Sequence, residues 1–237
     1  AMIGAGYTSV PVPIVITMMF RSGAHRPLSR RVRHLAAALM LLAVVPGGAW
    51  FTATRVNLDR AHAVGDVVDS LDGVEVFHNG GTGHVLGRNL APDGYNLGLK
   101  HQCVEFVKRY YYQRFDHRMP QDRGHARDFF QRGLADGTLN AERGLLQFVN
   151  GGASAPVAGD LVVFSPWVLN RYGHVAIVSA VGADFVEVIQ QNPGPFGSSR
   201  ERYALHRADA GVRVDHSRLL GWLRMPTGAG SAAPAAD

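Results

Sequence analysis

Cysteine and lysine are both scarce in this chain. Of its 237 residues one is a cysteine, Cys103, so this thiol has no disulfide partner within the chain. It is therefore either a small buried core residue or a reactive group. Lysine occurs only at Lys100 and Lys108, and the glycine-rich stretch at 80–100 has no lysine followed by Ser or Thr, which excludes a phosphate-binding loop.

Acidic residues are absent from residues 1–34, which contain five arginines. The rest of the chain has 19 basic and 19 acidic residues, so the net charge of +5 belongs to this first segment. The body has no net field that would attract phosphates, and no nucleic acid is expected as a partner.

The first segment predicts export. The arginine-rich run RPLSRRVRH precedes an apolar run at 35–51, which is the order of a secretory signal. We therefore assign 1–53 to an export leader or signal-anchor. Such a segment is either cleaved after export or kept as an anchor that holds the protein at the membrane. The small residues at 61–63 have the pattern of a cleavage site, but they lie far past the apolar run. The alternative without export is that the apolar run forms a buried core helix, which the five arginines directly before it disfavour.

Helical signals come first in the remaining sequence. Cys103, Phe106, Val107 and Tyr110 recur at helical spacing, which predicts a helix from about residue 102. A second short helix is expected around 124–133, whereas 81–100, rich in Gly, Asn and Asp, is expected to form a loop.

Strand signals follow. Runs rich in β-branched residues and bounded by Gly, Pro, Asn and Asp predict strands at 159–166, 173–182, 184–192 and 221–226. Helices followed by strands predict an α+β fold with an antiparallel sheet over 54–226. The small-residue tail at 227–237 is expected to be disordered.

Four polar positions interrupt these apolar elements. Cys103 opens the helix and His174 opens a strand, while Gln190 and Asn192 end the next strand. Side chains alternate along a strand, so Gln190 and Asn192 are expected on one face. If the two strands pair as a hairpin, one of these amides meets the imidazole, and the packed helix brings Cys103 to the same place.

This combination is the one that nucleophilic catalysis requires. A thiolate attacks a carbonyl, a histidine takes the thiol proton and returns it to the leaving amine, and an amide can hold the imidazole by its other nitrogen. Each residue also has a structural interpretation: Cys103 as core, His174 as an ordinary surface or core histidine, Gln190 and Asn192 as turn residues. A metal site at His84, His101 and Cys103 is not expected, because the spacing is irregular and no further thiol exists.

Several of these segments resemble the CHAP family, the cysteine- and histidine-dependent amidohydrolases/peptidases. DGYNLGLKHQCVEFVKRYY resembles the cysteine motif, GDLVVF with GHVAIVSAV the histidine block, VEVIQQN the third block and GWLRMP the closing strand. The amidase domains of glutathionylspermidine synthetase/amidase enzymes are the most similar members. The resemblance implies a papain-like fold with N-terminal helices packed on an antiparallel β-sheet, and hydrolysis of amide bonds without a cofactor.

The resemblance also implies residue roles. It assigns the nucleophile to Cys103 and the general base to His174. The third block usually has a glutamate where this chain has Gln190, and an amide orients an imidazolium but does not stabilise it by charge, so the orienting role could pass to Asn192. Gln102 can donate to the oxyanion. Tyr95 is expected to line the substrate groove.

Three hypotheses follow. The first is an exported bacterial cysteine amidase or endopeptidase that acts on peptidoglycan peptides, in the periplasm or cell wall or anchored to the inner membrane. The second keeps the chemistry but takes glutathionylspermidine or another small peptidyl amide. The third is a wall-binding domain without catalysis, suggested by Gln190.

Overall fold

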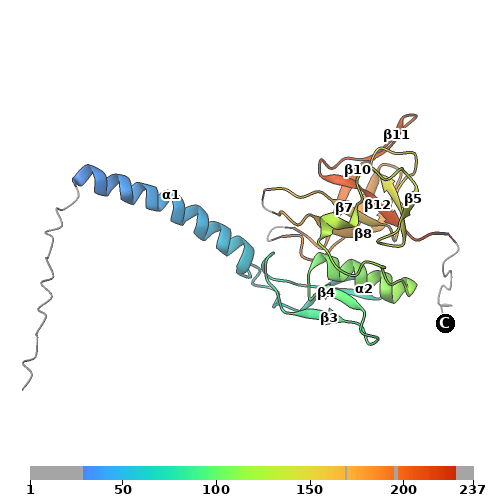
Figure 1. Ribbon diagram of the computed structural model, residues 1–237, viewed down its shortest axis with the longest axis horizontal. Helices are drawn as coiled ribbons and strands as arrows, with labels where there is room; N and C mark the ends of the chain where they lie inside the picture. The colour runs from blue at the N-terminus through green and yellow to red at the C-terminus, as the bar shows by residue number, and fades with distance from the viewer. Residues whose placement is uncertain (1–28, 169, 195–196, 228–237) are drawn as a thin grey trace, which may run out of the picture. The chain divides into compact units, whose positions relative to one another are not determined.

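The computed structural model describes residues 29–168, 170–194 and 197–227 (Figure 1). The chain divides into two compact units, residues 1–45 and 46–237. Helix α1 (Arg30–Arg55) starts in the first unit and is the one helix of the described residues that is long and apolar enough to cross a membrane. The expected tail lies almost entirely outside the described residues.

The described residues of the second unit form one further α-helix, a short 3-10 helix and twelve strands. The helices are α2 (Cys103–Phe115) and η1 (Ala126–Phe129). The strands are β1 (Val67–Leu71), β2 (Val74–Phe77), β3 (Arg88–Leu90), β4 (Asn96–Leu99), β5 (Thr138–Asn140), β6 (Leu145–Val149), β7 (Leu161–Phe164), β8 (His174–Val181), β9 (Phe185–Ile189), β10 (Arg200–Ala208), β11 (Gly211–Val214) and β12 (Leu219–Arg224).

Eight strands form one antiparallel sheet in the order β11-β10-β9-β8-β7-β12-β6-β5. The pairs β1-β2 and β3-β4 form two separate hairpins. The central strands β7, β8, β9 and β12 are those that the sequence predicted. The turn between β8 and β9 closes at Gly182, whose amide donates to the Phe185 carbonyl at 2.9 Å.

Helix α2 packs on one face of this sheet, and Figure 1 shows it lying along β8. Its buried Phe106, Val107 and Tyr110 share a core with Val175 and Ile177 of β8. Burial of such side chains is the main favourable contribution to folding. The predicted α+β architecture, a helix packed on an antiparallel sheet, is confirmed.

The opposite face of the sheet has its own core. Ala176 and Val178 of β8 alternate with the residues that face α2, and they pack with Val162, Val188 and Trp222. This second cluster draws residues from β6 through β12, so the sheet curves and encloses its own inner face. Burial on both faces explains why the sequence of β8 is almost continuously apolar.

Two predictions about local structure were wrong. The helix expected around 124–133 is the single 3-10 turn η1, which Gly124 and Gly133 flank at positive φ. The loop expected at 81–100 contains the hairpin β3-β4. Gly98 explains the glycine content there, because a Cβ at this position would lie 3.2 Å from the Glu105 backbone of α2.

Candidate active site

The turn that precedes α2 presents Cys103 as the first helical residue. His101 lies in this turn with φ of 63°, a left-handed conformation that is unfavourable for a residue other than glycine. Gln102 is the N-cap in an extended conformation, and its side chain does not cap the helix. The backbone thus turns sharply just before the cysteine and places the thiol at the positive end of the helix.

The side chain of Gln102 is held at both ends. Its Nε2 donates to the His84 carbonyl at 2.7 Å, and its Oε1 accepts from Asn192 Nδ2 at 2.7 Å. Asn192 also donates to the Thr82 carbonyl at 3.0 Å. Asn192 therefore fixes the amide next to Cys103, and its hydrogen bonds go to Gln102 and Thr82, not to His174.

His174 instead meets Gln190, since its Nε2 lies 2.8 Å from Gln190 Oε1. Gln190 donates from its own Nε2 to the Ser198 carbonyl at 3.1 Å, which leaves Oε1 as the acceptor towards the imidazole. His174 Nε2 must then carry the proton, and Nδ1 carries the lone pair. Nδ1 makes no hydrogen bond within the described residues and is the nitrogen free to act as a base.

The sulfur of Cys103 lies at the start of β8. The backbone N–H groups of Val175, the residue after His174, of Val104 and of Cys103 itself lower the pKa of the thiol. The thiol belongs to the core cluster beneath α2, whereas the His174 ring packs near Phe164 of the other cluster. Each of the two groups keeps 9% of its surface exposed.

Burial dominates the acid–base properties of both groups. It raises the pKa of the Cys103 thiol to about 11, although the surrounding backbone N–H groups lower it. It lowers the pKa of His174 to about 4, against the hydrogen bond that His174 donates to Gln190, which raises it. At neutral pH the thiol therefore keeps its proton and the imidazole is neutral.

A buried polar network, which the sequence analysis missed, holds the start of α2. Glu105 accepts from Arg109 Nε at 2.6 Å, from Asn89 Nδ2 at 2.8 Å and from Gln191 Nε2 at 2.8 Å. Gln191 also donates to the Gln102 carbonyl at 3.0 Å. The third sequence block thus connects the start of α2 to the sheet, because two adjacent amides bind different partners. Gln190 contacts the imidazole of His174, and Gln191 contacts the first turn of α2.

Tyr95 lies elsewhere. Its ring stacks on Tyr112 at 5.9 Å, its hydroxyl accepts from the Met119 amide at 3.0 Å, and the buried Lys108 ammonium lies 4.6 Å from its centroid. Burial raises the pKa of Tyr95 to about 12. These contacts support α2 from the side, and Tyr95 lines neither of the two cavities near His174.

Two cavities flank the loop that follows Gln190. One, of about 310 Å³, is lined by His174 and Gln190, by sheet residues and by the end of α1, including Trp50, Ala53, Thr54, Phe164, Tyr203 and Arg218. The other, of about 280 Å³, is lined by Gln190, Asn192 and residues 197–199, together with residues 76–80 at the end of β2 and just after it. Within the residues that the structure describes, no three His, Cys, Asp or Glu side chains gather closely enough to hold a metal ion.

Comparison with known proteins finds similarity to one domain family and to two curated enzymes. Residues 92–192 match the model of the CHAP domain. The bifunctional glutathionylspermidine synthetase/amidase of Escherichia coli is 30% identical over 147 residues, which are 57% of this chain and 23% of that protein. The trypanothione synthetase of Crithidia fasciculata is 27% identical over 106 residues, 45% of this chain and 16% of that one. The chain thus spans under a quarter of the length of these relatives.

Among solved structures, the endolysin LysIME-EF1 aligns with a TM-score of 0.33 and 18% identity, covering 62% of each chain. Ly7917 aligns with a TM-score of 0.30 and 19% identity, covering 53% of each chain. Both similarities are weak.

Proposed function

We propose, from the match of residues 92–192 to the CHAP domain, a domain of the cysteine amidohydrolase and peptidase class, that this chain is an exported enzyme that hydrolyses amide bonds in peptidoglycan peptides. One observation supports the catalytic assignment above others. Cys103 shares the core cluster beneath α2 with Val175, the residue after His174, and Gln190 holds the imidazole of His174 at Nε2.

In this proposal Cys103 attacks the scissile carbonyl while His174 Nδ1 takes the thiol proton. General-base transfer of this kind is required because the thiol pKa of about 11 leaves little thiolate at neutral pH. Gln190 holds the ring and its tautomer throughout. The imidazolium then gives the proton to the leaving amine, a thioester remains on Cys103, and water activated by His174 releases the acid.

The oxyanion of the tetrahedral intermediate needs hydrogen-bond donors close to Cys103. The backbone N–H of Cys103 at the start of α2 is one, and the second amide proton of Gln102 Nε2 is the other. Asn192 and the His84 carbonyl hold Gln102 in place, so this donor is positioned before the substrate arrives. We thus assign Asn192 a positioning role towards Gln102.

The substrate and location are proposed on two grounds. Helix α1 has the length and composition of a membrane span and follows an arginine-rich run, which supports export or anchoring over a cytosolic role. Peptidoglycan peptides are the amide substrate that an exported enzyme meets in the cell wall. A small amide related to glutathionylspermidine is the second candidate, and the similarity to the amidase of Escherichia coli supports it.

The test is digestion of purified peptidoglycan by the full chain, followed by mass analysis of the released fragments. We expect fragments whose masses identify one hydrolysed amide bond, and no such fragments with Cys103→Ser or His174→Ala. His206→Ala serves as the control, because this histidine is exposed on β10. Turnover that survives Cys103→Ser would exclude the mechanism. Binding to the polymer without any released fragment would favour a wall-binding domain.

Mass analysis of the mature protein tests the location. Recovery of a membrane-bound protein that retains α1 indicates an anchor, and recovery of a shortened soluble form from the periplasm or medium indicates cleavage. Recovery of the intact chain from the cytosol would contradict export.

A further inference from the structure

The last turn of α1 is part of the second compact unit. Residues 46–55 of this helix belong to the same unit as α2 and the large sheet. Residues 30–52 are exposed, and burial begins at Ala53 and Thr54, which are half-buried. The same two residues line the cavity that contains His174. The helix end therefore packs against the part of the unit that holds the candidate site.

Two hydrogen bonds join this turn to residues 81–84, which we call the 81–84 loop. The Gly83 amide donates to the Thr54 carbonyl at 2.7 Å, and Arg55 Nη1 donates to the Gly83 carbonyl at 2.8 Å. Thr54 has one of the carbonyls that an α-helix leaves without an internal partner at its C-terminal end. The loop satisfies this carbonyl, so the helix end has a defined partner in the fold.

The helix end and the loop lie too close together for a side chain between them. A Cβ at Gly81 would lie 2.7 Å from the Thr54 carbonyl oxygen, and a Cβ at Gly83 would lie 3.2 Å from the same oxygen. At Gly81 the obstacle is backbone, which cannot move aside as the end of a flexible side chain can. Glycine at position 81 is therefore required for this contact.

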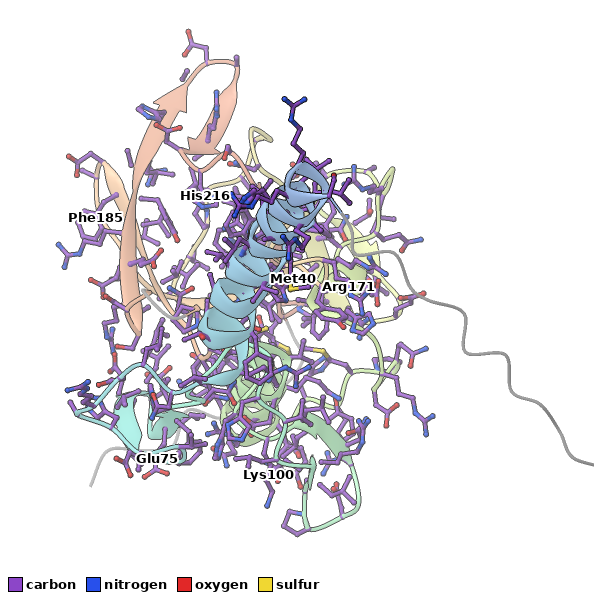
Figure 2. The ribbon with its side chains drawn as sticks, turned by 90° about the vertical axis from the view of Figure 1, so that its left-hand side faces the viewer. Met40, Glu75, Lys100, Arg171, Phe185 and His216 are labelled. Atoms are coloured by element: carbon purple, nitrogen blue, oxygen red, sulfur yellow. The ribbon has the colours of Figure 1, made fainter. Side chains whose placement is uncertain are left out.

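The other residues of the 81–84 loop hold the amide next to Cys103. The His84 carbonyl accepts from Gln102 Nε2 at 2.7 Å. The Thr82 carbonyl accepts from Asn192 Nδ2 at 3.0 Å, and the same Nδ2 donates to Gln102 Oε1. Lys100, labelled in Figure 2, opens the turn that carries Gln102. Alternate residues of the loop thus meet opposite partners, α1 on one side and the Gln102–Asn192 pair on the other.

We propose that the end of α1 positions the oxyanion donor of the site. Arg55 and the Thr54 carbonyl fix the 81–84 loop, and the loop fixes Gln102. This inference rests on the proposed function, in which Gln102 donates to the oxyanion, and such a donor is most effective when it is held in place before the charge develops. Cleavage at the small residues 61–63 would remove this turn, so the anchored form is expected to be the active one.

Turnover of soluble fragments of purified peptidoglycan by the full chain tests the proposal. Gly81→Ala should lower kcat about tenfold with KM nearly unchanged, because substrate still binds while Gln102 is displaced. Arg55→Gln should lower kcat about threefold, since this side chain is exposed, and Arg55→Lys should restore part of the loss. Two controls should leave both constants unchanged: Gly48→Ala, which has no neighbour within 4 Å, and Arg60→Gln, which is exposed.

A double-mutant cycle with Gln102→Ala separates positioning from general destabilisation. If α1 acts through Gln102, Gly81→Ala and Arg55→Gln should lower kcat no further once Gln102 is alanine. Equal losses of kcat with and without Gln102 would overturn the proposal. Circular dichroism checks folding, and Arg55→Gln, which adds no atom to the contact, keeps the test open if Gly81→Ala does not fold.

A second measurement does not depend on catalysis. The nuclear magnetic resonance signals of the Gln102 side-chain amide, assigned by their loss in Gln102→Ala, should move in Gly81→Ala and Arg55→Gln and stay in place in both controls. Signals that stay in place in every variant would overturn the inference, whatever the activity. Signals that move in a protein that releases no peptidoglycan fragments would support the link from α1 to Gln102 and count against the proposed function.

Discussion

Replacing Gln190 by glutamate tests the acid–base description of the site. The wild-type amide orients His174 through a 2.8 Å contact but adds no charge, and burial keeps the pKa of His174 near 4. A carboxylate in the same place would favour the imidazolium and raise this pKa. The substitution changes one amide to a group of almost the same shape.

The size of the effect follows from the geometry. A negative charge about 4 Å from the ring centre contributes roughly 4 kcal/mol at an effective dielectric of about 20, equivalent to about 3 pH units. Two costs offset it: Gln190 is buried, so the carboxylate is desolvated, and its donation to the Ser198 carbonyl at 3.1 Å is lost. A net rise of about 1 to 2 units is expected, so that His174 titrates near pH 5 to 6.

The assay is a nuclear magnetic resonance titration of the histidine rings, with the His174 signal assigned by its loss in His174→Ala. The acid limb of kcat/KM against pH should move with this titration, since protonated His174 cannot act as a base. Gln113→Glu, ten residues after Cys103 on the exposed side of α2, adds the same charge away from the site. A titration midpoint unchanged in Gln190→Glu would show that these two side chains do not interact in solution.

Three further predictions concern the support of the site. Glu105→Ala leaves a buried guanidinium without its partner and should lower the free energy of unfolding in urea by about 3 to 5 kcal/mol, whereas exposed Glu75→Ala should change it little. Asn192→Ala should lower kcat by about 10- to 100-fold with KM nearly unchanged, because Gln102 loses its anchor; an effect on KM alone would argue against this role. Because the unfolded chain binds a proton on His174 between pH 6.5 and about 4 and the folded chain does not, stability should fall by about 3 kcal/mol as pH falls through that range. His174→Gln should flatten this profile, and identical melting curves for the two proteins would contradict the buried neutral state.

Local sequence patterns were sufficient for the elements that build the site. The helical spacing from Cys103 to Tyr110 and the β-branched runs around β7, β8 and β9 gave α2 and the central strands. These signals work because one or both faces of each element are buried. The charged run of β10, which includes Glu201, carries no such pattern, and neither it nor β11 was predicted. The short hairpin β3-β4 was also missed, because its glycines and polar residues resemble a loop.

Strand alternation misled in one respect. It placed Gln190 and Asn192 on one face, with either able to reach the imidazole. Strand β9 ends at Ile189, and Asn192 has φ of 55°, so the backbone has turned before Asn192 is reached. The contacts of Asn192 with Gln102 and Thr82 follow from this turn, which the sequence did not indicate.

The sequence by itself determined which chemistry is available: one thiol at a helix start, one imidazole at a strand start, and two amides at the end of the strand that follows. Tertiary structure decided which amide meets the imidazole, that Glu105, Lys108 and Arg109 are buried, and that burial keeps Cys103 and His174 neutral. The physical reason is that periodicity reports only how one segment faces its surroundings. Hydrogen-bond partners and desolvation depend on atoms from segments far apart in the chain, which only packing brings together.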